Sequence, residues 1–243
     1  MGLSKEEAKI RGAALEQARR QKKAIAEELT DPGRFPPEEN PVSVFMAGAP
    51  GAGKTEASIE LLQDLEGEFG QIIRIDADEL RTRFDGYTGG NSHLFHPAVS
   101  VLVEKIHDVA LKRGQSFVLD GTLSNYERAE QNVRRSLKKD RIVQILYVYQ
   151  EPRLAWEVVT RREAIEGRNI RPEDFVEQYF ASRRVVNELK TCFGRRILVD
   201  LLVKNTRHGV RAYEANIDRI DHHIPEKYTV AEVRQFVGLE DTE

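Results

Sequence analysis

The chain has little of what disulfide-stabilised, zinc-binding or membrane-spanning proteins require. Its 243 residues include a single cysteine, Cys192. One cysteine excludes an intramolecular disulfide and a cysteine-rich metal site. No apolar run resembles a signal peptide or a membrane span, so we expect a cytoplasmic protein with no membrane partner.

Charge of one sign is also lacking. The chain has 37 lysines and arginines against 40 aspartates and glutamates, which gives a net charge of −3. This balance offers no general electrostatic attraction to nucleic acids or anionic membranes, so we expect no nucleic-acid partner. The length allows one large domain or two small ones.

One motif dominates what is present. Gly48-Ala49-Pro50-Gly51-Ala52-Gly53-Lys54-Thr55 fits the phosphate-loop pattern G-x-x-x-x-G-K-[ST] at every specified position. A short apolar run precedes it and helical spacing follows it, so the backbone N–H groups of the loop and the helix N-terminus are expected to bind phosphate oxygens. Lys54 is expected to reach the β- and γ-phosphates, and Thr55 to bind Mg²⁺. The motif therefore predicts ATP or GTP as a phosphoryl donor.

Apolar runs typical of buried strands alternate with helical patterns along the chain. We expect strands over 42–47, 71–75, 116–122, 142–149 and 196–203, and helices over 55–66, 99–112, 126–139, 152–168, 175–190 and 229–236. Such alternation favours a parallel sheet covered on both faces. The prediction is an α/β, P-loop NTPase-like three-layer sandwich with a mainly parallel sheet and an arginine-bearing lid.

The first 40 residues differ from the rest of the chain. A charged, alanine-rich helix, or two, is expected over residues 4–29, followed by a proline-rich break over 31–37. We predict an N-terminal helical extension over residues 1–40 and a P-loop kinase domain over 41–243. The extension is either a helix on the domain surface or a partner-docking element.

Carboxylates stand where two expected strands end. Asp76 and Asp78 follow one strand and Asp120 closes another. In a parallel sheet this edge binds ligands, so Asp78 is a candidate general base. Asp76 is either a Mg²⁺-orienting group or a helix cap, and Asp120 is a candidate Mg²⁺ ligand. Glu104, on the helix between them, is either an ordinary polar-face residue or a substrate-facing carboxylate.

Arginines cluster at the end of the helix expected over 152–168. Arg161, Arg162, Arg168 and Arg171 lie within eleven residues of one another. A guanidinium fork can neutralise the charge that spreads over the equatorial oxygens during phosphoryl transfer. The cluster indicates a lid over the γ-phosphate, the alternative being a solvated basic helix face. Residues 84–97 are candidates for a substrate-covering loop.

Together these residues resemble the zeta toxin family of bacterial toxin–antitoxin systems over roughly residues 42–202. The resemblance is carried by an ordered set: Gly48 to Thr55, Ile75-Asp76-Ala77-Asp78 with Arg81, Glu104, Asp120-Gly121-Thr122, Arg161 and Arg168. It implies a Mg²⁺-dependent kinase that phosphorylates the 3′-hydroxyl of the amino sugar of UDP-N-acetylglucosamine, or of a related UDP-sugar, and so blocks cell-wall precursor synthesis. It also implies a small helical antitoxin as partner.

The resemblance assigns roles position by position. It implies that Asp78 is the catalytic base, that Glu104 and Arg81 hold the substrate, and that Thr122 and Asn132 contact the sugar nucleotide. Departures are that Asp120 stands where the family often has Glu, and Asn132 where Thr is usual.

For the lid, the resemblance implies that Arg161 and Arg168 stabilise the transferred phosphoryl group together with Lys54. A shift by a residue or so in the lid would bring in Arg162 or Arg171 instead.

Two other functions stay open from the residues alone. One is a kinase for another small hydroxylated substrate, or for a polynucleotide 5′-end. The other is a nucleotide-switched regulator without an acceptor, which lacks an Asn-Lys-x-Asp guanine motif here and leaves Asp78 and Glu104 without a role. Acceptor-dependent nucleotide consumption separates the two classes.

Overall fold

A computed structural model describes residues 3–69, 71–167, 169–205 and 210–239. Its strands are β1 Val42–Ala47, β2 Ile73–Asp76, β3 Phe117–Asp120, β4 Ile142–Gln150, β5 Leu198–Asn205 and β6 Val210–Glu214. Its helices are α1 Lys5–Leu29, α2 Lys54–Phe69, α3 Ala77–Arg81, α4 Ser92–Arg113, α5 Tyr126–Leu137, α6 Pro152–Glu166, α7 Pro172–Phe193, α8 Ile220–His223 and α9 Val230–Phe236, with a 3₁₀ turn at Gly194–Arg196.

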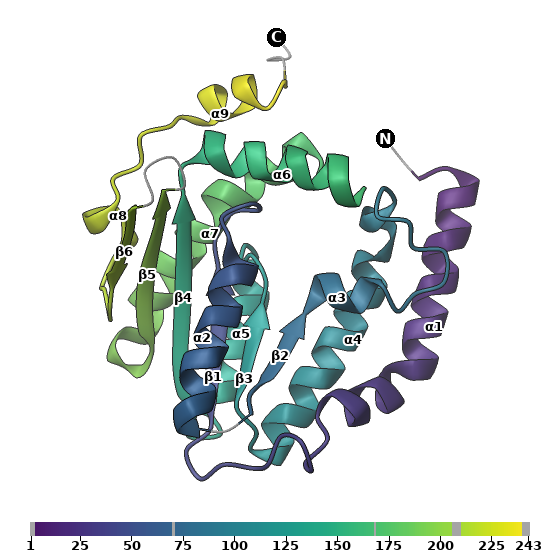
Figure 1. Cartoon of the computed structure of the whole chain (residues 1–243), viewed down its shortest axis with the longest axis vertical. Helices are drawn as coiled ribbons and strands as arrows, with labels where there is room; N and C mark the ends of the chain where they lie inside the picture. Colours follow the sequence, from purple (N-terminus) through teal and green to yellow (C-terminus); the bar gives the residue numbers. More distant parts are fainter. Residues whose placement is uncertain (1–2, 70, 168, 206–209, 240–243) are drawn as a thin grey trace.

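The described strands form one six-stranded sheet in the order β2-β3-β1-β4-β5-β6. All neighbouring pairs are parallel except β5 and β6, which are antiparallel. Helix α2, which follows β1, lies on one face, and α5, which follows the adjacent strand β3, lies on the other (Figure 1). Adjacent strands whose connections leave in opposite directions create a ligand crevice at their carboxyl ends.

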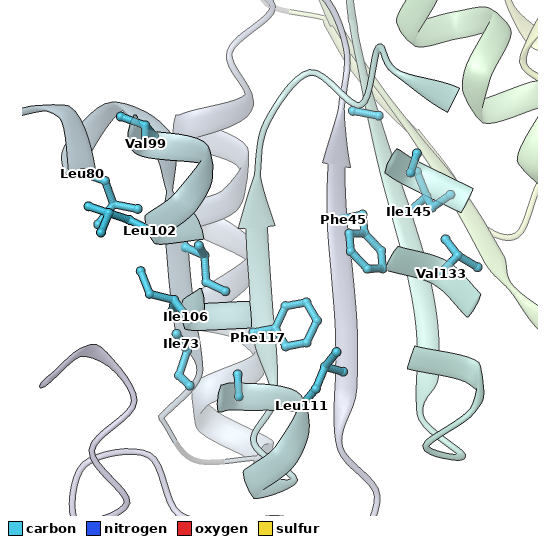
Figure 2. Close-up of a cluster of buried hydrophobic side chains, with 14 of the residues drawn as sticks. Phe45, Ile73, Leu80, Val99, Leu102, Ile106, Leu111, Phe117, Val133 and Ile145 are labelled. Atoms are coloured by element: carbon cyan, nitrogen blue, oxygen red, sulfur yellow. The ribbon is translucent and has the colours of Figure 1, made fainter. Parts of the chain in front are cut away.

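Alternating side chains of the strands fill two cores. Val44 and Met46 of β1 face α2, whereas Phe45 faces the larger core under α4, α5 and α7. Figure 2 shows this second core, in which Phe117 of β3 lies between Phe45 and Ile106 of α4. With helices on both faces, the molecule is the α/β three-layer sandwich that the sequence predicts.

Helix α1 is a single helix, and one of its faces is buried. Ser4 begins it with a capping box, in which the Ser4 hydroxyl accepts from the Glu7 amide at 3.2 Å. It lies along α4 (Figure 1), with Ala14 and Ala18 in the same core as the sheet. Residues 1–40 as a separate extension stay a prediction, but their helix shares the core that lies against the sheet.

Two elements differ from those expected. Helix α4 begins at Ser92, seven residues before the expected start, with Pro97 inside it, because burial of Leu94 and Phe95 offsets the lost backbone hydrogen bond. The short antiparallel strand β6 was not expected. Among the described residues, no helix combines the length and apolar character needed to cross a bilayer.

Candidate functional site

A cavity of about 440 Å³ opens at the carboxyl ends of β1, β2 and β3. This is the crevice that the strand order predicts. Its walls come from the phosphate loop, the α3 turn, α4, the loop after β3, the first turns of α5, and the segment from α6 to α7. Helix α6 lies beyond the carboxyl ends of the strands (Figure 1), as the predicted lid requires. Segments far apart in sequence therefore meet in one cavity.

The phosphate loop is shaped by glycines that no other residue can replace. Gly51 has φ +74°, and a Cβ there would lie 2.1 Å from the Ala155 carbonyl oxygen. Gly48 has φ +134°, and a Cβ on Gly48 would lie 2.3 Å from the Val148 carbonyl oxygen. Both values are far below contact distance, so the loop packs against backbone and only glycine fits. Gly51, Gly53, Lys54 and Thr55 line the cavity together with Pro50.

The other predicted nucleotide-binding residues lie behind the cavity wall, apart from Lys54. Gly48, Ala49 and Ala52 do not line the cavity, and both alanines are buried. The Lys54 ammonium folds back over the loop and donates to Gly48 O at 3.0 Å and to Ala49 O at 2.7 Å. Lys54 thus already lies across the loop that would hold the phosphates.

Sequence reasoning missed a second lysine at the loop. Lys204, in β5, is 7% exposed, and its ammonium donates to Gly53 O at 2.9 Å. The two residues are 151 positions apart in the chain, so no local motif connects them. Lys204 fixes the Gly53 carbonyl and adds positive charge beside the loop.

Two of the predicted carboxylates belong to one buried ionic cluster. Asp76 and Asp120 are register partners on β2 and β3, and the Arg74 guanidinium contacts both. Ser58 of α2 also donates to Asp120 Oδ2 at 3.1 Å. Burial, followed by the charges of Asp120 and Asp78, raises the pKa of Asp76, against the attraction of Arg74.

Asp76 caps a helix, which was one of the two roles expected for it. Its Oδ1 accepts from the Asp78 amide at 2.7 Å and so begins α3. This cap directs the next carboxylate, Asp78, into the cavity, where the Asp78 side chain is 31% exposed. Arg81 of the same helix forms an ion pair with Asp78 and also lines the cavity.

The loop after β3 holds a strained residue beside the predicted sugar contacts. Leu123 has φ +52°, which is uncommon for a residue with a side chain and costs of order 1 kcal/mol. Thr122, before it, lines the cavity, and its Oγ1 lies 3.0 Å from Ser124 Oγ. Thr122 O also accepts from the Gly48 amide at 3.3 Å, which connects this loop to the phosphate loop. Asn132, on α5, lines the cavity as well.

Two predicted residues are not brought to the cavity. Glu104 is exposed on α4, although Ser100 and Val103 of the same helix line the cavity. Arg161 is exposed on α6 and does not line it either. Each points elsewhere because consecutive helical residues are about 100° apart around the axis.

Among the described residues of the lid, Arg162 and Arg171 line the cavity in place of Arg161. Arg162 lines the cavity, and its guanidinium contacts Glu56 Oε1 of α2 at 2.7 Å. Arg171 also lines it and forms an ion pair with Asp174 at 2.8 Å. These are the shifted alternatives that the sequence left open. Arg168 lies outside the described residues.

The residues near the phosphate loop suit a Mg²⁺ ion that is bound mainly by the phosphates of the nucleotide. Mg²⁺ typically binds one or two carboxylates together with substrate phosphates and water. Thr55 and Asp120 offer a hydroxyl and a carboxylate in the same cavity, and both described contacts of Asp120 fall on one oxygen, Oδ2. Within the described ranges there is no group of three histidine, cysteine or acidic side chains able to hold an ion alone.

Strand order, phosphate loop and carboxylates at the strand ends define a nucleotide-binding protein with a P-loop NTPase-like fold. The model of the zeta toxin family matches residues 25–218, so the chain belongs to the zeta toxin family, the kinase-like toxins of toxin–antitoxin systems. No curated protein sequence matches the chain.

Solved structures share this fold. One comes from a study of the PezAT chromosomal toxin–antitoxin system of Streptococcus pneumoniae, with 18% identity, a TM-score of 0.61, and coverage of 87% of this chain and 81% of that one. Another is the AvrRxo1-ORF1:ORF2 complex with ATP, with 17% identity, a TM-score of 0.59, and coverage of 86% and 67%. A third, of the same pair with sulphate ions, has 16% identity, a TM-score of 0.59, and coverage of 88% and 70%. At these identities the likeness concerns the fold.

Proposed function

We propose that this protein is a kinase that transfers the γ-phosphoryl group of ATP or GTP to a sugar hydroxyl of UDP-N-acetylglucosamine or a related UDP-sugar. The observation that carries the proposal is that Lys54 of the phosphate loop and the carboxylate of Asp78 line the same cavity. A phosphoryl donor bound at the loop and an acceptor hydroxyl at Asp78 would then face each other. A nucleotide switch without an acceptor gives Asp78 no such use.

In the proposed reaction Asp78 accepts the proton of the attacking hydroxyl, and Arg81 holds Asp78 in place through their ion pair. Lys54 and Arg162 neutralise the charge that develops on the transferred group, since both line the cavity from opposite elements, α2 and α6. Mg²⁺ held by Thr55 and Asp120 would supply further charge neutralisation at the β- and γ-phosphates.

Family membership supports the remaining parts of the proposal. The product would block cell-wall precursor synthesis in the cytoplasm, where UDP-sugars serve as substrates. A small helical antitoxin would silence the enzyme, as the toxin–antitoxin context of the family suggests. The UDP-sugar, Thr122 and Asn132 as its contacts, and the antitoxin are all parts of this proposal.

The test replaces Asp78 and follows product directly. Purified protein is incubated with Mg-ATP and a panel of UDP-sugars, and a new phosphomonoester is sought by phosphorus NMR. Asp78→Asn should abolish detectable transfer, because general-base catalysis contributes roughly 10²- to 10⁴-fold to the rate. The ATP dissociation constant should stay within about threefold, because the donor phosphates are expected to bind at the phosphate loop. Asp85→Asn is the matched control, since Asp85 is exposed and does not line the cavity. Wild-type turnover by Asp78→Asn would show that the base is a different residue.

A further inference from the structure

Four arginines line the cavity, and three of them are already neutralised. Arg81 forms an ion pair with Asp78, Arg162 with Glu56, and Arg171 with Asp174. The fourth, Arg128, has no carboxylate within ion-pair distance among the residues that the structure describes. Its described side-chain contact is a weak hydrogen bond from Nη1 to Ser100 Oγ at 3.3 Å.

The place of Arg128 separates it from the phosphate loop. It lies in the first turn of α5, and its contact with Ser100 puts the guanidinium between α5 and α4. Asn132, one turn further along α5, lines the same wall. The positive end of the α5 dipole adds to the charge of Arg128 at this wall. The phosphate loop, which would hold the phosphates of the donor, leads into α2 on the other face of the sheet.

The cavity as a whole needs such a charge if its second ligand is an anion. Asp76, Asp78 and Asp120 also line it, but Arg74 contacts the first and the last and Arg81 contacts Asp78, so these ion pairs offer little net charge to a second anionic ligand. Arg81 and Arg171 are paired with carboxylates of the protein itself, and Arg162 is the arginine proposed to act on the transferred phosphoryl group. An arginine with a planar fork and no acidic partner suits bidentate binding of a phosphate or a diphosphate.

We infer that Arg128 binds an anionic phosphate or diphosphate group of the acceptor and so selects nucleotide-linked acceptors over neutral sugars and nucleosides. The inference rests on the proposed function, because it takes Asp78 as the point at which the acceptor hydroxyl reacts. It adds that the enzyme recognises the phosphate or diphosphate group of the acceptor, at a distance from the reacting hydroxyl.

Steady-state kinetics with UDP-N-acetylglucosamine test the assignment. Arg128→Gln should raise the KM for this acceptor about 10- to 100-fold, as expected for a lost hydrogen bond between charged groups. The KM for ATP should stay within about twofold, because the donor phosphates bind at the loop. Arg128→Lys should restore part of the affinity, since it keeps the charge and loses the fork. Arg135→Gln is the matched control on α5, because Arg135 pairs with Asp108 outside the cavity.

A neutral acceptor separates anion recognition from a structural role. With free N-acetylglucosamine as substrate, wild type and Arg128→Gln should have the same kcat/KM, so the preference for the UDP-sugar collapses in the variant. Raising the salt concentration should increase the acceptor KM of the wild type more steeply than that of the variant. An unchanged KM for UDP-N-acetylglucosamine, or equal losses with both acceptors, would overturn the inference.

Calorimetric binding of UDP-N-acetylglucosamine distinguishes this inference from the proposed function. If the wild type binds it more tightly than Arg128→Gln but transfers no phosphoryl group, the proposed reaction fails and the role of Arg128 stands. If both proteins bind it equally, the role of Arg128 fails whatever the turnover. If the wild type does not bind it, both are wrong.

Discussion

The stability of this protein should fall in mild acid because of one buried histidine. His107 of α4 is 1% exposed and lies edge-on against Phe117 and Phe45, with ring centroids 4.8 Å and 6.2 Å away. Its Nε2 is buried without a hydrogen-bond partner. Burial, together with the charges of Arg135 and Arg141, lowers the pKa of His107 from 6.5 to about 3.

The sign and size of the effect follow from proton linkage. Between pH 6.5 and pH 3 the unfolded chain binds a proton at His107 that the folded protein does not, so acid favours unfolding there. The contribution is complete above pH 6.5 and is lost as the pH falls. The cost is about 2 kcal/mol at pH 5 and about 3 kcal/mol at pH 4, relative to pH 8.

Urea unfolding of wild type and His107→Leu, followed by circular dichroism at pH 5 and at pH 7.5, measures this cost. The difference in unfolding free energy between the two proteins should shift by about 2 kcal/mol in favour of the variant at pH 5. Taking the difference cancels the titration of groups common to both. His223→Leu, at an exposed position, should shift stability by less than about 0.5 kcal/mol. Parallel pH profiles for wild type and His107→Leu would refute the reasoning.

Four further variants test the site and the core. Arg162→Ala should lower kcat for phosphoryl transfer by about 10³-fold, whereas Arg161→Ala should leave it nearly unchanged; the reverse order would restore the arginine first predicted. Gly51→Ala should abolish ATP binding in calorimetry, because its Cβ would lie 2.1 Å from Ala155 O; retained affinity would show that the loop can shift. Ala18→Asp should destabilise the protein by about 3 kcal/mol or more, since Ala18 is 0% exposed; an unchanged urea midpoint would place α1 outside the core.

The phosphate loop and the strands β1 to β5 could be predicted because their determinants are local. Gly48 to Thr55 is a contiguous motif, and the strands before and after it are apolar runs of ordinary length. The parallel sheet followed from the alternation of strands and helices. The helix predicted over 229–236 corresponds to α9, which a capping box of Thr229 and Glu232 begins.

The remainder depends on contacts that a linear pattern does not contain. Lys204 reaches Gly53 across 151 positions, and Arg74 joins Asp76 to Asp120 across a strand pair. Which lid arginine faces the cavity depends on the rotation of the helix, because neighbouring residues point to different faces. Arg162 therefore lines the cavity and Arg161 does not. The start of α4 was hidden by Pro97, whose local preference is outweighed by burial in the core.

The central claim is that one cavity binds a nucleoside triphosphate and a UDP-sugar and joins them by phosphoryl transfer. Incubation with Mg-ATP and UDP-N-acetylglucosamine, followed by phosphorus NMR, tests it most directly. The account predicts a new phosphomonoester on the sugar, formed with ADP in equal amount and absent with Asp78→Asn. Release of inorganic phosphate without any phosphorylated UDP-sugar from the panel, despite tight ATP binding, would contradict it.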